Sequence, residues 1–151
     1  MQSNNLKYLI RRMGNIDREK WIDFYKGLSI DTISFRYGHV VKNIDDQVCK
    51  NEFNRTLTSF ALIAEIEDKI IGCGELYIFD TEGEITLTIA DEYQGNGLGT
   101  ILMEKIEKVA RMKKLKLIYF ETMSSNFRMK KIGMKLGYEK DEKYYIYTKM
   151  L

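Results

Sequence analysis

A glycine-rich stretch in the middle of the chain has the residue types and the spacing of a phosphate-binding loop. Between Gln94 and Thr100, glycine stands at every second position, as Gly95, Gly97 and Gly99. Glycines let a backbone turn sharply and present consecutive N–H groups to one acceptor. A helix that begins here adds unpaired N–H groups and the positive end of its dipole. Each hydrogen bond to a charged acceptor contributes about 1.5–3 kcal/mol, so roughly three or four of them could hold a pyrophosphate without a metal.

The residues on either side predict a strand before this loop and a helix after it. Residues 84–90 alternate polar and apolar side chains, which places Glu84 on one face with Thr86, Thr88 and Ala90. Residues 97–113 carry apolar side chains at helical spacing. A glycine-rich turn without a ligand is the alternative. It is disfavoured because each glycine at a helix start costs up to about 1 kcal/mol.

The rest of the chain predicts a single α+β domain over residues 1–151, with a mixed, mostly antiparallel sheet flanked by helices. The predicted order is β-α-α-β-β-β-α-β-α-β, and a further helical piece is expected over 45–53. Gly72 and Gly74 indicate a bulge or a close approach, and Ser124 or Ser125 is expected to cap the last helix. The predicted strands are 6–13, 58–66, 69–79, 84–90, 115–121 and a final strand or hairpin within 138–150; the predicted helices are 17–28, 30–37, 97–113 and 125–136.

Composition narrows the class of protein. With 44% hydrophobic and 30% charged residues, the 151-residue chain should be globular. A net charge of +2 disfavours a nucleic-acid partner. The two cysteines, Cys49 and Cys73, show no metal or disulfide spacing, and the single histidine, His39, makes a metal site or a Ser-His-Asp triad improbable. These residues therefore predict no metal. No secretory or membrane-spanning stretch is visible, so we also expect a cytoplasmic protein with no membrane partner.

The loop also carries a family signature. Gln94-x-x-Gly97-x-Gly99 resembles the Q/R-x-x-G-x-G/A motif of the GNAT acetyltransferase superfamily. As in that family, a strand and a second helix follow, that helix contains Asn126, and it ends in Leu136-Gly137-Tyr138, similar to the common L-G-F/Y ending. The resemblance covers roughly residues 58 to 150 and implies the GNAT fold.

Three further segments resemble the catalytic domain of bacterial protein-lysine acetyltransferases: 35–38, the acidic helix from Asp45, and 83–94. The resemblance implies an N-acetyltransferase that takes acetyl-CoA as acyl donor. It implies a primary amine as acceptor, from a protein lysine or a small molecule, attacking directly in a ternary complex. The alternative is a non-catalytic acyl-CoA-binding or regulatory module, and a nucleotide-binding protein of another fold is disfavoured. The oligomeric state is not predicted.

The resemblance also implies which residues contact the cofactor. The diphosphate would meet the backbone N–H groups of the loop. The backbone of Ile89, Ala90 and Asp91 would pair with the pantetheine arm, although ordinary sheet-edge pairing is the alternative. Asn126 would contact the cofactor near its amide or thioester, or else it is a polar residue at a helix start. Two basic runs, 111–116 and 128–135, are interpreted most simply as solvated helix faces, and the alternative is that Arg128 or one lysine meets the 3′-phosphate. The loop residues so assigned are Gln94, Gly95, Asn96, Gly97, Leu98, Gly99 and Thr100.

Glu84 is the predicted catalytic base. A pantetheine arm that follows the strand back from Gln94 would carry its thioester towards Glu84, where similar proteins place their base. A lysine with a pKa near 10.4 is neutral in only about one of 2,500 molecules at pH 7, a handicap of about 4.6 kcal/mol. A carboxylate, directly or through a water, could relieve much of it. A solvated glutamate after a turn is the alternative, and Glu75 is the second candidate.

One departure from the family concerns the proton for the departing thiolate. Many GNAT enzymes carry a tyrosine seven residues after the asparagine, but this chain has Gly133 there. Either the thiolate leaves unaided, which a thiol pKa of about 8.5 allows, or another tyrosine serves. Tyr138 and Tyr119 are the candidates. The same gap motivates the non-catalytic alternative.

Overall fold

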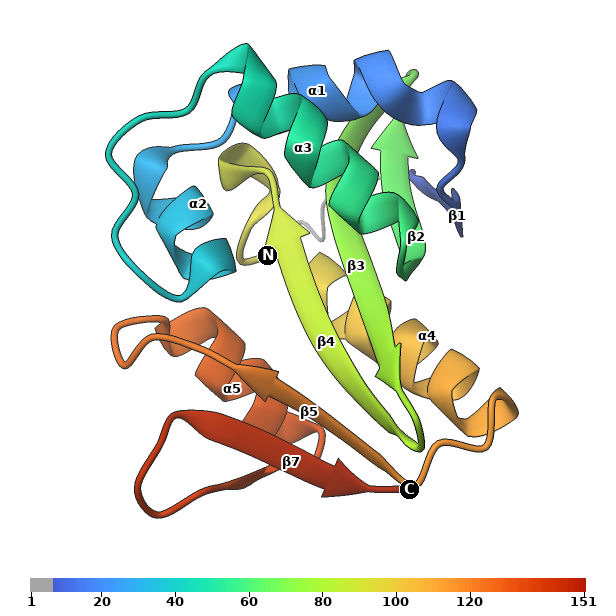
Figure 1. Cartoon of the computed structure of the whole chain (residues 1–151), viewed down its shortest axis with the longest axis vertical. Helices are drawn as coiled ribbons and strands as arrows, with labels where there is room; N and C mark the ends of the chain where they lie inside the picture. The colour runs from blue at the N-terminus through green and yellow to red at the C-terminus, as the bar shows by residue number, and fades with distance from the viewer. Residues whose placement is uncertain (1–6) are drawn as a thin grey trace.

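The computed structural model describes residues 7–151, which form one seven-stranded sheet with helices on both faces (Figure 1). The fold class predicted from the sequence is confirmed. The final strand or hairpin predicted within 138–150 is present as two strands. The helix expected over 45–53 extends to Leu57. The elements are β1 (Leu9–Arg12), a 3-10 turn (Asn15–Asp17), α1 (Arg18–Lys26), α2 (Ile30–Tyr37), α3 (Asp46–Leu57), β2 (Phe60–Ile66), β3 (Lys69–Phe79), β4 (Glu82–Ile89), a 3-10 turn (Asp91–Tyr93), α4 (Leu98–Met112), β5 (Leu117–Glu121), α5 (Phe127–Lys135), β6 (Glu139–Lys140) and β7 (Ile146–Met150).

The strands lie in the order β1-β2-β3-β4-β5-β7-β6. The meander β2-β3-β4 is antiparallel, as the alternating pattern predicts. The pair β4-β5 is parallel, because α4 carries the chain back across the sheet between these two strands. The remaining pairs are antiparallel, so the sheet is mixed and mostly antiparallel.

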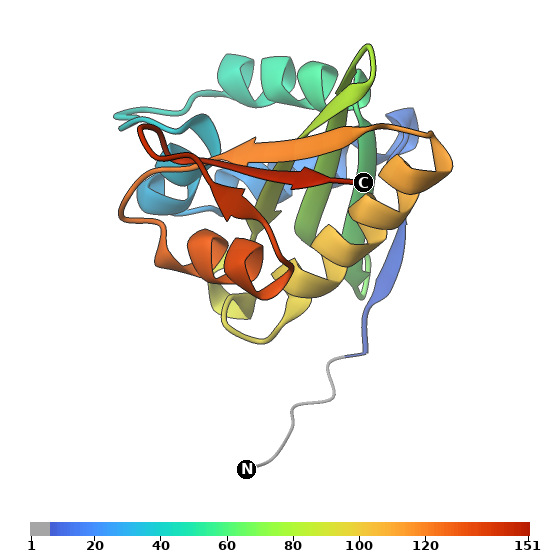
Figure 2. The ribbon, with the colours of Figure 1, turned by 90° about the horizontal axis from the view of Figure 1, so that it is seen from below.

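Helices cover the two faces of the sheet unequally. On one face, α1, α2 and α3 pack over β2, β3 and the end of β4 around Trp21, Tyr25 and Phe53. On the other face, α4 and α5 pack around Ile106 and Phe120 (Figure 2). In Figure 1 no helix lies in front of β5, β7 and the start of β4. Within the described residues, the part of the first face over β5 and β7 is therefore left without a helical layer.

The strands β4 and β5 separate soon after they begin to pair. Their ladder contains only Glu82–Glu84 on β4 and Leu117–Tyr119 on β5. Beyond this point β4 stays with β3 up to Ile89, whereas β5 stays with β7. Figure 1 shows the two arrows diverging from a common start. Within the described residues, the edge of β4 after Glu84 faces an open split instead of a neighbouring strand.

Two local expectations are refined. The last helix is capped by Asn126, whose side chain accepts from the N–H of Met129, so the prediction of Ser124 or Ser125 is wrong by one or two residues. Gly72 marks a close approach, since a Cβ there would lie 2.9 Å from Ile89 Cδ1 and 3.2 Å from Leu98 Cδ2.

Over residues 7–151, no helix combines the length and the apolar character needed to cross a membrane.

Candidate active site

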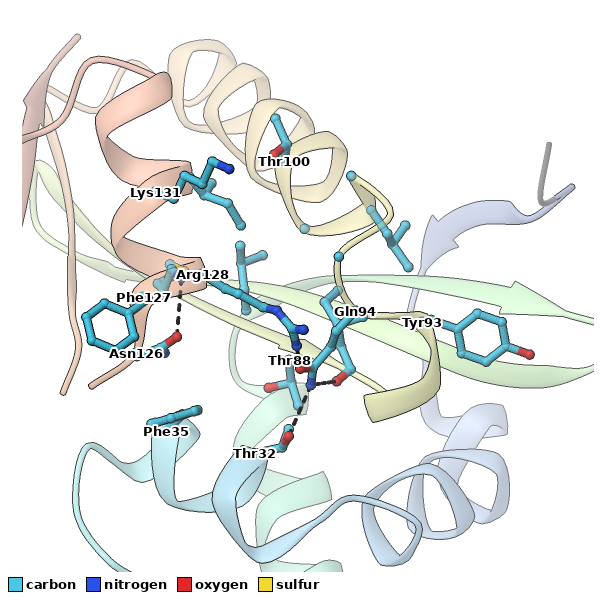
Figure 3. A pocket seen from close by; sticks show the side chains of 18 of the residues that line it. Thr32, Phe35, Thr88, Tyr93, Gln94, Thr100, Asn126, Phe127, Arg128 and Lys131 are labelled. Atoms are coloured by element: carbon cyan, nitrogen blue, oxygen red, sulfur yellow. Dashed lines mark hydrogen bonds between the residues drawn. The ribbon is translucent and has the colours of Figure 1, made fainter. Parts of the chain in front are cut away.

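A cavity of about 640 Å³ opens where the split between β4 and β5 meets α2, α4 and α5 (Figure 3). Leu87 and Ile89 line it from the face covered by α4, and Thr88 and Phe35 line it from the face covered by α2. The cavity therefore passes through the split from one face of the sheet to the other. Of the predicted cofactor residues, it is lined by Ile89, Gln94, Gly95, Gly97, Leu98, Gly99, Thr100 and Asn126.

The glycine loop has the geometry of an anion site. Gly95 and Gly97 adopt positive φ of 77° and 85°, a conformation in which other residues are strained. Gly97 is the N-cap of α4, so no side chain caps the helix, and its first turn contains no acidic residue. The first turn of a 15-residue helix thus lines the cavity, and no side chain caps its N–H groups. A Cβ on Gly99 would lie 2.9 Å from Ile132 Cδ1, so glycine lets α5 pack beside this turn.

The charge of the cavity wall is positive. Arg128, Lys131 and Lys135 line it from one face of α5, at helical spacing, and no aspartate or glutamate is among the lining residues. Figure 3 shows Arg128 and Lys131 reaching towards the glycine loop. From the sequence alone, solvated helix faces are the simpler interpretation of this basic run. The i, i+3, i+7 spacing was the available signal, but it becomes informative only once α5 is known to lie beside the loop.

The Gln94 side chain joins three elements at the cavity mouth. Its Nε2 donates to the Ile89 carbonyl at 2.9 Å and to Thr32 Oγ1 at 3.1 Å, and its Oε1 accepts from Arg128. These bonds tie the end of β4 to α2 and α5 (Figure 3). Gln94 is the first residue of the glycine loop, and its side chain therefore also positions Arg128.

Three predicted cofactor residues lie outside the cavity lining. Ala90 donates its N–H to Ile71 O and accepts from Tyr93 N, both at 2.9 Å, so its backbone is already bonded within the protein. Because backbone groups alternate along a strand, those of Ile89 point the other way, towards the split. Asn96 lies at the outer turn of the loop and its Nδ2 contacts backbone carbonyls.

Asp91 fastens α2 to the end of β4. Its carboxylate accepts from the backbone N–H of Ser29 at 2.9 Å and from the hydroxyls of Ser29 and Thr32 at 2.6 and 2.7 Å. Burial acts to raise the pKa of Asp91, but these hydrogen bonds outweigh it and hold the pKa below its usual value. The side chain thus positions Thr32, which lines the cavity.

Asn126 lies at the start of α5 and on the wall of the cavity. Its Oδ1 accepts from Met129 N at 3.2 Å and so caps α5. The residue also lines the cavity (Figure 3). The cap uses the amide oxygen, and the two N–H donors of Nδ2 remain outside that bond.

Glu84 lies at the apex of the split and is partly buried. It is the last β4 residue in the ladder with β5, where it pairs with Tyr119, and on its other side it pairs with Tyr77 of β3. It does not line the cavity as such, since Thr88 is the nearest lining residue on its face, about 13 Å along the strand. The structure therefore places Glu84 at the closed end of the split and the glycine loop at its open end.

Glu75 forms a buried ion pair. It is fully buried and pairs with Arg36, and it also accepts from Thr56 at 2.7 Å and from Tyr77 at 2.9 Å. Burial favours its protonated form, but Arg36 and the two hydroxyls outweigh burial and hold the pKa of Glu75 below its usual value. An enclosed carboxylate of low basicity is unsuited to accept a proton from a substrate, so the second candidate base is not supported.

A tyrosine side chain would not fit at position 133. A Cβ at this position would lie 2.5 Å from Phe120 Cζ, because α5 packs its Gly133 face directly on the sheet. Tyr138 is buried in the same core, 5.2 Å from the Phe120 ring, and burial together with Glu107 raises its pKa. It is therefore shielded from the split.

No cluster of three or more metal-ligating side chains occurs among residues 7–151. Both cysteines are buried, and burial raises the pKa of the Cys73 thiol. The site thus offers an anion pocket and a carboxylate at opposite ends of one strand.

The comparison with known proteins defines the family. The model of the acetyltransferase (GNAT) family matches residues 21–138. Acetyltransferase PA5475 of Pseudomonas aeruginosa is 31% identical over 137 residues, which are 86% of this chain and 74% of that protein. The chain therefore belongs to the acetyltransferase (GNAT) family and is an enzyme of the N-acetyltransferase class.

Solved structures show the same fold. The GNAT domain of S. lividans PAT superposes with a TM-score of 0.81 at 20% identity, covering 94% of this chain and 89% of that domain. The PaiA N-acetyltransferase of Thermoplasma acidophilum, solved in complex with coenzyme A, gives a TM-score of 0.75 at 20% identity, covering 97% of this chain and all of that one (100%). The resemblance inferred from the loop motif is confirmed at the level of the superfamily.

Proposed function

We propose that this enzyme takes acetyl-CoA as acyl donor and transfers the acetyl group to a primary amine, on a protein lysine or a small molecule, in a ternary complex. The observation that carries the proposal is the cavity itself. An uncapped helix N-terminus and three cations face it, and no acidic side chain lines it. Coenzyme A is polyanionic, and its diphosphate fits such a wall. The complex of the T. acidophilum relative with coenzyme A supports this assignment.

The diphosphate would bind at the N–H groups of the segment Gln94–Thr100, with Arg128, Lys131 and Lys135 as counter-charges. The pantetheine arm would follow the free edge of β4. Within the predicted segment Ile89 to Asp91, Ile89 has backbone groups that point into the split. Its carbonyl now accepts from Gln94, so that bond would be exchanged on binding. Asn126 would offer its amide N–H groups to the arm.

Glu84 would accept the proton of the amine. An arm that follows the edge of β4 from the glycine loop ends at the apex, where β4 and β5 pair. The amine must lose a proton before attack, and a carboxylate at the apex lowers the cost of about 4.6 kcal/mol estimated for a lysine at neutral pH. Backbone N–H groups of β4 would polarise the thioester carbonyl. Both cysteines are buried, so direct attack is favoured over an acyl-enzyme.

A panel of amines tests this proposal. Purified protein is mixed with acetyl-CoA and with small amines or lysine-containing peptides, and released thiol is measured. We expect thiol release with at least one class of acceptor and coenzyme A binding in calorimetry. Binding without turnover across the panel would contradict the proposal and favour the non-catalytic module, for which Gly133 is the specific observation. A cytoplasmic location stays a prediction.

A further inference from the structure

Glu84 has a tyrosine on each side of it in the sheet. Tyr77 of β3 and Tyr119 of β5 are its direct partners in the two ladders. The side chains of directly paired residues point to the same face and lie within about 5 Å of one another at their Cβ atoms. Among residues 7–151, no helix covers this face at the start of β4 (Figure 1). The side chains of two tyrosines therefore flank the predicted base.

The two tyrosines differ in what already holds them. The Tyr77 hydroxyl donates to Glu75 at 2.9 Å, and Arg55 lies over its ring at 5.3 Å. Burial and the Glu75 charge raise the pKa of Tyr77, so its hydroxyl stays protonated and bonded to Glu75 in the buried ion-pair network. Tyr119 is partly exposed and lies on β5, across the split from the free edge of β4. Of the two, only Tyr119 borders the split.

Resting on the proposed function, we propose that Tyr119 is the catalytic acid that protonates the departing thiolate, in place of the tyrosine that Gly133 excludes. Glu84 and Tyr119 are the last pair before β4 and β5 separate. A thioester that follows the β4 edge to the apex ends between them. The other tyrosine suggested by the sequence, Tyr138, is enclosed in the core beneath α5.

The charges around Tyr119 keep it in the form that an acid needs. Burial raises the pKa of Tyr119, and Glu84, Glu82 and Glu121 raise it further. A phenol with the ordinary pKa of about 10 already holds its proton at neutral pH, so these charges leave Tyr119 protonated. They also make its phenolate a strong acceptor for the proton that returns from Glu84. The same three carboxylates favour a cationic acceptor at this face, as an amine is before it reacts.

The proton balance closes within this pair. Glu84 first takes the proton that makes the amine cationic and releases it to water. The neutral nitrogen then forms a bond to the thioester carbon and passes a second proton to Glu84. The C–S bond then breaks, its electron pair goes to sulfur, and the Tyr119 hydroxyl supplies the proton that gives the free thiol. The proton on Glu84 passes to the Tyr119 oxygen, directly or through a water, so both side chains return to their initial state.

The test compares Tyr119→Phe with Tyr77→Phe, two identical changes on either side of Glu84. Tyr119→Phe should lower kcat about 100-fold, at the low end for a positioned acid because a thiolate is a fair leaving group. Its thermal midpoint and its coenzyme A affinity should match the wild type. Imidazolium added to Tyr119→Phe should raise kcat in proportion to its concentration, and it should leave the wild type unchanged. Tyr77→Phe should keep kcat.

Each other outcome has a distinct meaning. Full kcat in Tyr119→Phe, with an active wild type, overturns the acid role and leaves the proposed function standing. A raised KM for the amine without rescue by imidazolium makes Tyr119 a positioning residue and also overturns the acid role. A wild type that binds coenzyme A but releases no thiol with any amine overturns the proposed function and this inference together.

Discussion

Glu75 and Glu84 lie on the same face of neighbouring strands, yet the fold gives them opposite environments. Glu75 lies under α2 and α3, fully buried against Arg36. Glu84 lies two ladder positions along the hairpin from the row of Glu75, beyond the helices and at the apex of the split. The residue type and the strand face are the same. What differs is the layer above them, and this layer decides whether a carboxylate stabilises the fold or is available to a substrate.

Replacing Glu75 should have the largest effect on stability. Glu75→Gln leaves the buried Arg36 guanidinium without its main counter-charge, which costs about 3–5 kcal/mol of unfolding free energy. Glu84→Gln, at a partly exposed site without an ion pair to Arg36, is the matched control and should unfold at nearly the wild-type urea concentration. Equal losses in the two variants would contradict the contrast.

The pH dependence sharpens this first prediction. The pKa of folded Glu75 lies below its usual value, so the ion pair adds stability above the unfolded pKa of about 4.3. That contribution is lost as pH falls through the lower folded pKa. In urea titrations, the difference between wild type and Glu75→Gln should therefore be full near pH 7 and shrink below about pH 4. A difference that stays constant down to pH 3 would argue against an ionised Glu75.

Replacing Glu84 should have the largest effect on turnover. Glu84→Gln removes the proposed base and should lower kcat about 100- to 1,000-fold at neutral pH, within the range of general-base catalysis. Coenzyme A affinity in calorimetry should be unchanged, because the anion pocket lies at the other end of β4. The deficit should narrow at higher pH, where more of the amine is already neutral. A variant with full kcat at pH 7 would exclude Glu84 as the base.

The glycine loop should give an intermediate effect, confined to binding. Gly95→Ala forces a side chain into positive φ at a cost of about 1–2 kcal/mol, which would weaken coenzyme A binding about 10-fold if the loop moves. Gly38→Ala carries the same strain at φ 73°, outside the cavity lining, and serves as the control. Calorimetry should separate the two variants, and equal affinities would mean that loop geometry is not used.

The cations of α5 should give the smallest effect. Lys131→Ala should weaken coenzyme A binding about fivefold, since an exposed ion pair contributes up to about 1 kcal/mol. Lys108→Ala removes a lysine from the exposed side of α4, outside the cavity lining, and should leave affinity unchanged. The Lys131 effect should fade in titrations at about 1 M salt, where the Debye length is about 3 Å. Persistence at high salt would point to a contact other than charge.

Local patterns in the sequence predicted most of the elements, because period two, period 3.6 and turn glycines act over a few residues. The meander, the strand-loop-helix at the glycine motif and the parallel crossover followed from such patterns. The predicted cap of α5 was one or two positions before the actual cap, Asn126. Several polar residues precede α5, and any of them can cap a helix. The α5 cations gained meaning only when that helix was placed beside the loop.

The sequence by itself determined the glycine motif, the face on which Glu84 lies and the membership of the family that these features indicate. Periodicity assigns a residue to a face, but it does not say what covers that face. Only the tertiary structure decided that Glu75 is enclosed and Glu84 is not, that Gly133 packs on Phe120, and that Tyr119 stands beside Glu84 at the apex. Burial depends on segments far apart in the chain, whereas strand and helix periods depend on neighbours.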